Sequence, residues 1–484
     1  MERREVRIAS RWKLTPEACT EGPFKGYVGI DRISSAAGKL KAGERMTSLM
    51  HHLSEENLRA AFRSVDGNKA CGIDQVTKKE YGKKLEANLA ELVDEIKRGG
   101  FRPKPAREVL IPKAQGGWRS LAVGCLEDKI LQTLLAKILS ATFEPIFHEH
   151  SFGFRRGKNA HQALAHLYKE ISYRDKACVV VEMDIEKFFD TVDHDRMMEL
   201  LRTRIGDEKM LRLLRRLLKN SVLQKGSVMK EQGEGTPQGS PVSPVLANIY
   251  LHYALDEWFK EKWGEHGSIT RYADDAIFVF GDEEKAKEFR AALETRLTEF
   301  SLRLHPEKSQ LRSFKPRSPS GDLPFLGFAL YWGRSAGKRS ELKVKTLPKR
   351  LGRCIQEFKE WIKNNRHKHK LDKLWSLARA KILGHYNYYG VSFNVKKLNH
   401  FYHACTGLLF RWLNRRSQKR SFTWERFQRR LMFHPIPAPT EGALVVNITS
   451  MHGTEPKRKP KSRMRKLRKS GSVRSSGRQR PLFT

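Results

Sequence analysis

The sequence has no long apolar run. No stretch of its 484 residues approaches the ~18 consecutive apolar residues that cross a bilayer, so we predict no membrane span. The first residues are charged throughout and lack the apolar segment of a secretory signal. Together these absences argue against a membrane surface as the partner of the protein.

Closely spaced cysteines are also lacking. The six cysteines include no CxxC pair, which excludes a zinc ribbon and a Cys-based nuclease knuckle. In a long chain without an export signal, an even number of cysteines is no evidence of disulfides. We therefore expect reduced and mostly buried thiols.

Acidic residues are scarce relative to basic ones. The chain has 93 Lys and Arg against 54 Asp and Glu, a net charge of +39. So large an excess excludes a typical neutral metabolic enzyme and predicts an anionic partner, here nucleic acid. Hydrophobic residues make up 39% of the chain, enough for sizeable cores.

Strand and helix patterns alternate through the middle of the chain. We predict a buried strand over 178–185 and a strand, tight turn and strand over 268–280, with helical patterns around them. Beyond residue 345 the pattern is helical, basic and rich in Trp and Tyr. From Lys457 to Arg480 there are 12 Lys or Arg and no acid, which predicts a solvated tail that clamps RNA or DNA nonspecifically.

Two acidic sites carry the chemistry. Asp274 and Asp275 follow Tyr272-Ala273 at the expected turn, where adjacent carboxylates repel unless water or a cation neutralises them. Taken alone, two aspartates in a turn are usually only a turn. In the buried strand CVVVEMD, however, alternation places Val179, Val181 and Met183 on one face and Val180, Glu182 and Asp184 on the other, so Asp184 ends this strand. If the fold unites the three, they can hold two Mg²⁺ ions for in-line phosphoryl transfer.

The chain resembles the reverse transcriptase/maturase proteins encoded by group II introns, especially the bacterial kind that lacks an HNH endonuclease domain. The resemblance covers roughly residues 45 to 440 and follows the order of motifs in the family. Beside the Asp184 strand, the motifs are GIDQVT (72–77), IPKAQGGWRSL (111–121), SFGFRRGKNAHQAL (151–164), TPQGSPVSPVLANIYLHYALD (236–256), YADD (272–275), LHPEKS (304–309), FLGF (325–328), GHYNYYG (384–390) and RRSQKRSFTWERF (415–427).

The resemblance implies an α+β fold: a right-hand polymerase whose fingers and palm, with an antiparallel sheet, precede an α-helical thumb/maturase (X) domain. We accordingly expect a basic N-terminal extension over 1–70 and the fingers and palm over 71–335. The thumb/maturase domain would cover 336–440, and a basic C-terminal tail, expected to be disordered, would cover 441–484.

The implied activity is that of an RNA-directed DNA polymerase, a nucleotidyltransferase with two Mg²⁺ ions as cofactor. Its implied partners are dNTPs, an RNA template with a DNA primer, target DNA and the encoding group II intron RNA, whose splicing and mobility the protein would promote. We expect it in a bacterial cytoplasm as a ribonucleoprotein. The cognate intron, its insertion site, the priming mechanism and the oligomeric state stay open.

Three alternatives remain at this point. The chain could be a domesticated relative that serves repair or defence without an intron, because the catalytic motifs would look the same. It could be a splicing cofactor that no longer polymerises, although the intact carboxylates oppose this. A viral RNA-dependent RNA polymerase is more distant, because a Phe at the gate position and the maturase-like thumb oppose it.

Roles for single residues also follow from the resemblance. The metal ligands would be Asp184, Asp274 and Asp275, with the Ile185 carbonyl nearby. Lys113 and Arg119 would grip the triphosphate, with Arg107 a weaker candidate, and Lys308 would lie near the leaving pyrophosphate. Phe188 would be the steric gate that excludes a ribose 2′ hydroxyl, with Phe189 as the competing assignment. Gln238 and Gly239 would position the template base and the nucleotide.

Some features depart from the family or admit a plainer interpretation. Ser120 stands where the family often has Pro, so we expect the triphosphate grip to differ in detail. No HNH-type Cys/His knuckle follows residue 440, and we predict no DNA endonuclease. The aromatic residues Tyr386, Tyr388, Tyr389 and Trp424 could stack on RNA, but at helical spacing we expect most of them in the core.

Overall fold

The computed structural model describes residues 24–112, 117–174, 178–223, 229–230, 234–236, 238–316, 321–335, 337, 339–416, 422–439 and 446–449. All of them belong to one unit, Met1–Ser450. No helix in these ranges is long and apolar enough to cross a membrane. The five cysteines they include form no disulfide, and Cys125, Cys178 and Cys405 are buried.

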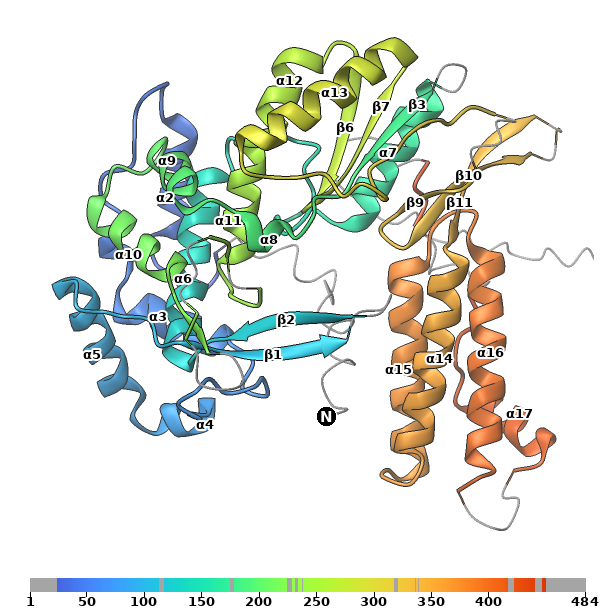
Figure 1. Ribbon diagram of the computed structural model, residues 1–484. Coiled ribbons are helices and arrows are strands. Elements are labelled where there is room, and N and C mark those ends of the chain that lie inside the picture. Colours follow the sequence, from blue (N-terminus) through green and yellow to red (C-terminus); the bar gives the residue numbers. More distant parts are fainter. Residues whose placement is uncertain are drawn as a thin grey trace, which may run out of the picture. The chain divides into compact units, whose positions relative to one another are not determined.

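The first part of the chain is built around one buried helix. Its elements are α2 (Ile30–Lys39), η2 (Met50–His52), α3 (Glu55–Ser64), α4 (Lys78–Tyr81), η3 (Gly82–Lys84), α5 (Leu85–Arg98), β1 (Ala106–Pro112), β2 (Trp118–Val123) and α6 (Leu126–Phe143). Helix α6 is buried along most of its length, and α2 and α3 pack on it. The antiparallel β1–β2 pair, which we call the fingers hairpin, projects from this part (Figure 1).

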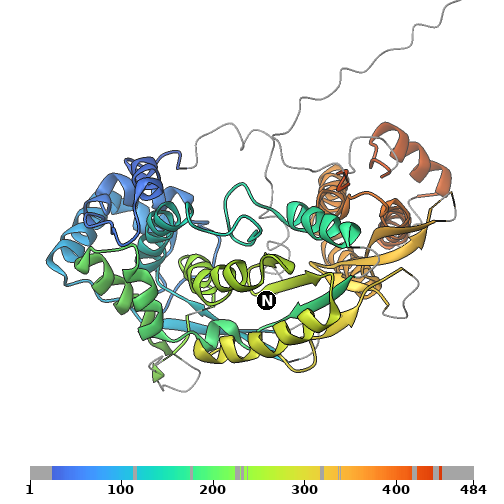
Figure 2. The ribbon, with the colours of Figure 1, turned by 90° about the horizontal axis from the view of Figure 1, so that it is seen from above.

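A four-stranded antiparallel sheet, the palm sheet, follows in the order β6-β7-β3-β8. The elements of this part are α7 (Ala160–Tyr173), β3 (Val179–Met183), α11 (Ser243–Leu251), the π-helical η4 (His252–Asp256), α12 (Glu257–Trp263), β6 (Gly267–Tyr272), β7 (Asp275–Phe280), α13 (Glu283–Glu299) and β8 (Leu311–Ser313). Helices α12 and α13 cover one face of the sheet and α7 the other (Figures 1 and 2).

Alternation along β3 assigns its side chains to these two layers. Val179, Val181 and Met183 join the core formed with α13, whereas Val180 joins the core formed with α7. This confirms the alternation predicted from the sequence. Between β3 and α11 lie α8 (Phe188–Thr191), α9 (His194–Arg202), α10 (Glu208–Leu218), β4 (Val222–Leu223) and β5 (Met229–Lys230). Strand β4 pairs in parallel with β1, which ties the fingers hairpin to this region.

The last part is a small sheet and a helical bundle. The sheet contains β9 (Leu323–Phe325), β10 (Phe328–Arg334) and β11 (Ser340–Thr346) in the order β11-β10-β9. The bundle, here called the thumb helices, contains α14 (Pro348–Asn365), α15 (Leu371–Tyr389), α16 (Val395–Leu413) and α17 (Trp424–Phe433). The predicted α+β class, with an antiparallel sheet followed by a helical thumb, is confirmed.

A short C-terminal segment returns to the base of the thumb helices. Val446 pairs in parallel with Val391, and the backbone N–H of Val446 donates to the Gly390 carbonyl at 2.7 Å. Ile448 is 1% exposed and belongs to the same core as the helices. At residues 446–449, therefore, the chain is packed, which corrects the expectation of a disordered tail from residue 441.

Candidate active site

The YADD motif forms the turn between β6 and β7. Tyr272 pairs with Asp275, so that Ala273 and Asp274 make a two-residue hairpin turn. Ala273 has a φ of 60°, the left-handed conformation that such turns require and that a residue with a Cβ adopts only at some cost. The turn therefore has to be held by its surroundings.

The SFGF segment packs directly on this turn. A Cβ added to Gly153 would lie 2.2 Å from the Ala273 nitrogen and 2.9 Å from its Cα. Only glycine allows so close an approach. The sequence analysis identified this segment as a family motif but predicted no role for Gly153. The need for glycine at this position arises from its contact with Ala273, which lies 120 positions away in the sequence.

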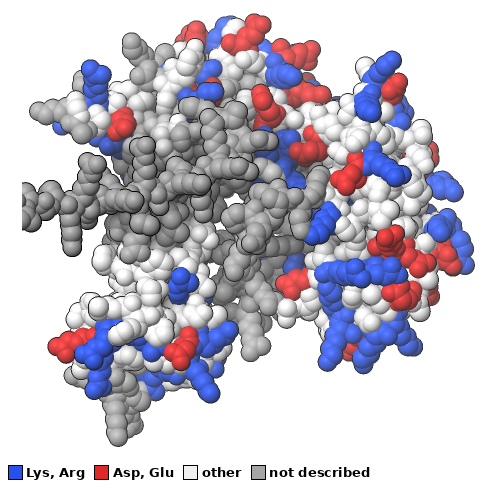
Figure 3. All heavy atoms as spheres, turned by 180° about the vertical axis from the view of Figure 1, so that it is seen from behind, with Lys and Arg blue, Asp and Glu red and all other residues white. Residues whose placement is uncertain are grey.

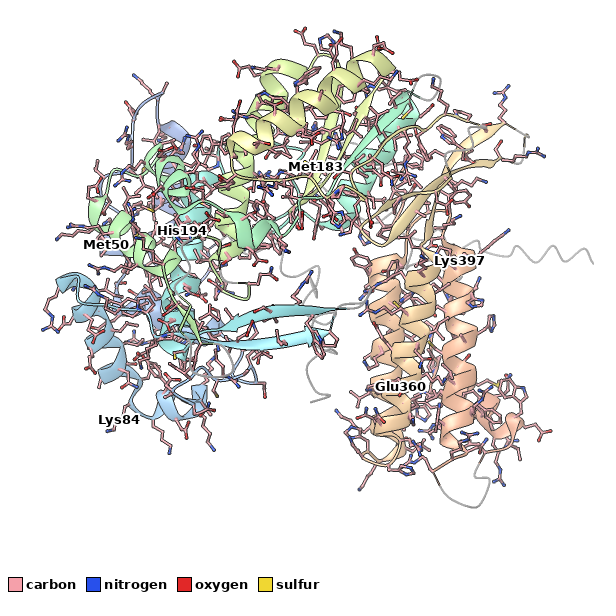
Figure 4. The ribbon with its side chains drawn as sticks, viewed as in Figure 1. Met50, Lys84, Met183, His194, Glu360 and Lys397 are labelled. Carbon is pink, nitrogen blue, oxygen red and sulfur yellow. The ribbon has the colours of Figure 1, made fainter. Side chains whose placement is uncertain are left out.

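Asp184 lies just beyond β3, one residue after Met183 (Figure 4). Its carbonyl accepts hydrogen bonds from the backbone N–H of His305 at 2.8 Å and from the Ser309 hydroxyl at 3.1 Å. The Lys308 ammonium lies 3.0 Å from the Asp184 carboxylate. Ile185 forms an antiparallel bridge with Leu304, so the LHPEKS segment wraps the end of the strand.

The three predicted carboxylates meet at one edge of the palm sheet. Met183 pairs with Ala276 in antiparallel register, which places Asp184, just after Met183, and Asp275, just before Ala276, at the same edge. Burial first, and then the charges of Asp274 and Asp184, raise the pKa of the Asp275 carboxyl to about 7. Burial and the charge of Asp184 also raise the pKa of Asp274. The fold thus brings together acids that lie 90 residues apart in the sequence.

This donor set suits a hard divalent cation. Asp274 is half-buried and the outer side of Asp275 is exposed, so the carboxylates are open to a ligand. Oxygen donors are what Mg²⁺ takes, and a cation would relieve the repulsion that raises these pKa values. In the part of the chain that the structure describes, no group of three or more His, Cys, Asp or Glu side chains is already arranged to hold a metal ion, and Asp184 is instead paired with Lys308. The two Mg²⁺ ions stay a prediction.

The structure relates only some of the predicted nucleotide-binding residues to this edge of the sheet. Arg119 is exposed on β2. Its charge partly offsets the rise in the pKa of Asp274, so the guanidinium acts on the turn. Lys113 lies outside the described residues. Arg107 donates to the Cys71 carbonyl at 3.0 Å, which fixes it to the base of the fingers hairpin. The Gln238 carbonyl accepts from the Ala122 N–H at 2.8 Å, so this loop adjoins β2.

The two candidates for the gate differ in burial. Phe188 is 2% exposed and its ring lies edge-on to the buried Tyr250 ring. Phe189 is only partly buried, and its carbonyl accepts from the Thr236 N–H at 2.6 Å. Phe189 is therefore the more accessible of the two candidates, and the assignment of the gate stays a prediction.

The tyrosines of GHYNYYG lie in the core, as expected for most of that group. Tyr386 and Tyr389 are buried, and the Tyr388 hydroxyl donates to the Leu326 carbonyl at 3.0 Å. They therefore hold the FLGF turn between β9 and β10. Trp424 is 52% exposed and is still open to RNA.

The thumb helices carry an exposed basic surface. Lys and Arg side chains gather on the free end of this bundle in Figure 3. Exposed basic residues of the bundle include Lys363, Lys368, Lys370, Lys373, Arg379, Arg426 and Arg429. Such a surface suits a phosphate backbone.

Comparisons with known proteins agree on one family. Residues 111–330 match the family described as reverse transcriptase (RNA-dependent DNA polymerase). The chain is 30% identical to protein YkfC of Escherichia coli K12 over 327 residues, which are 60% of this chain and 83% of that protein.

Two intron-encoded proteins match over shorter stretches. The group II intron-encoded protein LtrA of Lactococcus lactis subsp. cremoris is 31% identical over 225 residues, 46% of this chain and 37% of that protein. An uncharacterized 91 kDa protein in the cob intron of Schizosaccharomyces pombe is 38% identical over 187 residues, 38% of this chain and 22% of that protein. The chain thus spans only a minor part of these two relatives.

The pKa of Asp275 predicts how the metal-free protein responds to pH. The folded chain binds this proton more tightly than the unfolded chain, whose aspartate titrates near ~3.9. The stabilisation is therefore complete below about pH 4 and is lost as the pH rises through about 7. We expect the free energy of unfolding of wild type, in urea with EDTA, to fall from about pH 5 to about pH 8 relative to Asp275→Asn.

The side chain of Asn at position 275 is uncharged at every pH. The difference in the free energy of unfolding between the two proteins therefore reports the titration of the Asp275 carboxyl. Added Mg²⁺ should narrow the difference at the upper end of the range, because the cation favours the ionised form. A difference in the free energy of unfolding that stays constant across this pH range would show that the pKa of Asp275 is not raised in the folded chain.

Proposed function

The chain belongs to the reverse transcriptase family, in the group that includes group II intron-encoded proteins, and from this we propose that it synthesises DNA on an RNA template and binds its encoding intron RNA. The fold is that of a right-hand polymerase. The observation that carries the proposal is the meeting of Asp184, Asp274 and Asp275 at one sheet edge within the matched segment.

Reverse transcriptases generally use divalent metals, which Asp184, Asp274 and Asp275 would hold with the Ile185 carbonyl. When bound, such ions neutralise the charge that develops on the reacting phosphate and favour ionisation of the primer 3′ hydroxyl. The protein supplies the positions of these oxygens through the β3–β7 register and the turn. Rigid placement matters because the reacting atoms have to be aligned in line.

The remaining side chains would orient the nucleotide. Arg119 offers a planar fork to the triphosphate, and its exposure leaves it free to do so. Lys308 neutralises Asp184 in the metal-free chain and stands where it can bind the leaving pyrophosphate once the metal takes over that carboxylate. Gln238, next to β2, would contact the nucleotide and the template base.

Polymerisation is tested on a primed RNA template with dNTPs and Mg²⁺. We expect extension by wild type and a loss of at least about 100-fold in Asp274→Ala, because one of the charges that orders the metals is gone. Asp94→Ala, an exposed acid on α5, is the matched control and should extend like wild type. Equal extension by Asp274→Ala and wild type would refute the polymerase assignment.

The gate is tested by two substitutions. We expect Phe189→Ala to raise the use of rNTPs relative to dNTPs by at least about tenfold, because the ring that excludes the 2′ hydroxyl is removed. Phe188→Ala should instead lower the free energy of unfolding by about 3–5 kcal/mol, because it empties a core site. A change in the rNTP/dNTP ratio in folded Phe188→Ala alone would restore the original assignment.

Intron binding is tested by crosslinking the protein, expressed with its native flanking DNA, and sequencing the bound RNA. We expect one dominant structured RNA that spans the gene, and spliced exons that disappear without the protein. The exposed basic thumb surface supports this partner. A spread of unrelated RNAs with intact DNA synthesis would identify a domesticated polymerase.

A further inference from the structure

One arginine is completely buried beside the YADD turn and takes no direct part in the chemistry proposed above. Arg271, at the end of β6, is 0% exposed. A buried guanidinium is unfavourable unless an acid and hydrogen-bond acceptors satisfy it. Its partners therefore show what it is there to hold.

The guanidinium contacts three different parts of the protein. Its Nε and Nη2 donate to the two carboxylate oxygens of Asp256 at 2.8 and 2.5 Å. Its Nη1 donates to the Asn248 side-chain oxygen at 3.1 Å and to the Ala273 carbonyl at 3.0 Å. The last bond reaches the first residue of the turn that presents Asp274 and Asp275.

The acid that pairs with Arg271 lies in a widened turn of its helix. Asp256, 1% exposed, ends the π-helical segment η4 between α11 and α12. The carbonyls of Tyr253 and Ala254 within this segment accept from Arg296 at 3.0 and 3.1 Å. Arg296 thus satisfies backbone groups in a wider turn than an α-helix has, a kind of turn that is frequent at functional sites.

The same network reaches the other side of the turn. The Asn248 side-chain amide donates to the Gly153 carbonyl at 2.8 Å, and Gly153 is the residue packed against the Ala273 backbone. The Phe152 N–H donates to the Arg271 carbonyl at 2.8 Å. The left-handed Ala273 is therefore held by Arg271 and by the SFGF backbone together.

We propose that Arg271, clamped by Asp256, is a positioning residue that fixes the Ala273 carbonyl and thereby the metal-binding geometry of Asp274 and Asp275. The inference rests on the proposed function for its meaning and adds a residue outside the YADD motif to the polymerase site. It predicts that the pair can be removed without unfolding the protein but not without weakening the hold on divalent metal.

The decisive variant is the double substitution Arg271→Met with Asp256→Leu. Apolar residues of similar volume often replace a buried ion pair without loss of stability, so we expect a folded protein. We expect it to bind primer–template RNA like wild type, with kcat lower by about 100-fold because the turn is no longer fixed. The Mg²⁺ concentration that gives the half-maximal rise in melting temperature should increase, a readout that needs no polymerisation.

Arg174→Met is the matched control. It removes an arginine that pairs with Glu170 at 2.5 Å behind the same sheet and has no bond to the turn. This variant should keep the Mg²⁺ dependence and kcat of wild type. A double variant that is folded and has the kcat and Mg²⁺ titration of wild type would overturn the proposal.

Arg271→Lys decides the matter if the double variant does not fold. It keeps the charge for Asp256, but a single ammonium cannot reproduce the fork that reaches Asn248 and Ala273 as well. We expect a folded protein with lower kcat and weaker Mg²⁺ binding, and wild-type values would overturn the proposal. If wild type itself makes no DNA, the proposed function fails, and the Mg²⁺ melting titration still tests Arg271.

Discussion

Mutual repulsion among three carboxylates is the constraint around which the palm is organised. The charges of Asp184 and Asp274 raise the pKa of Asp275, and the charge of Asp184 raises the pKa of Asp274, in addition to the rise that burial causes in both. Nothing in their own chemistry keeps them together in the absence of a cation. The backbone therefore has to do it, through the β3–β7 pairing and through cores on both faces of the sheet.

Two separate sets of contacts hold the strand end with Asp184 and the turn with Asp274. Asp184 is fixed by the segment that carries Lys308 and Ser309, which binds its carbonyl and neutralises its carboxylate. The turn with Asp274 is fixed from behind by a buried arginine and by the backbone at Gly153. Neither set of contacts depends on the other, so the site is set in place before any ligand arrives. Such preorganisation is what electrostatic stabilisation of a transition state requires.

The sequence was sufficient to predict the features that depend on local hydrophobic pattern and on the order of the motifs. Alternation placed the side chains of β3 and the end of that strand at Asp184, and the hairpin around YADD was predicted as well. It gave Phe188 as the gate with Phe189 competing, because neither a strand nor a helix period extends through the left-handed Lys187, with a φ of 48°, and the four-residue helix after it. It could not predict that Arg271 is buried, since its acid comes from a π-helical turn that no period reveals.

The thumb helices are an extension of the palm core. One apolar cluster runs from α7 through β9–β11 into α14–α16, and Tyr388 binds the turn whose Leu326 has a φ of 50°. The interactions that place these tyrosines in the core also remove their rings from contact with RNA. On the described surface of the thumb helices, a bound RNA would then meet mainly lysine and arginine, with Trp424 for stacking. Recognition by this surface would therefore depend on charge and on the shape of the RNA rather than on base edges.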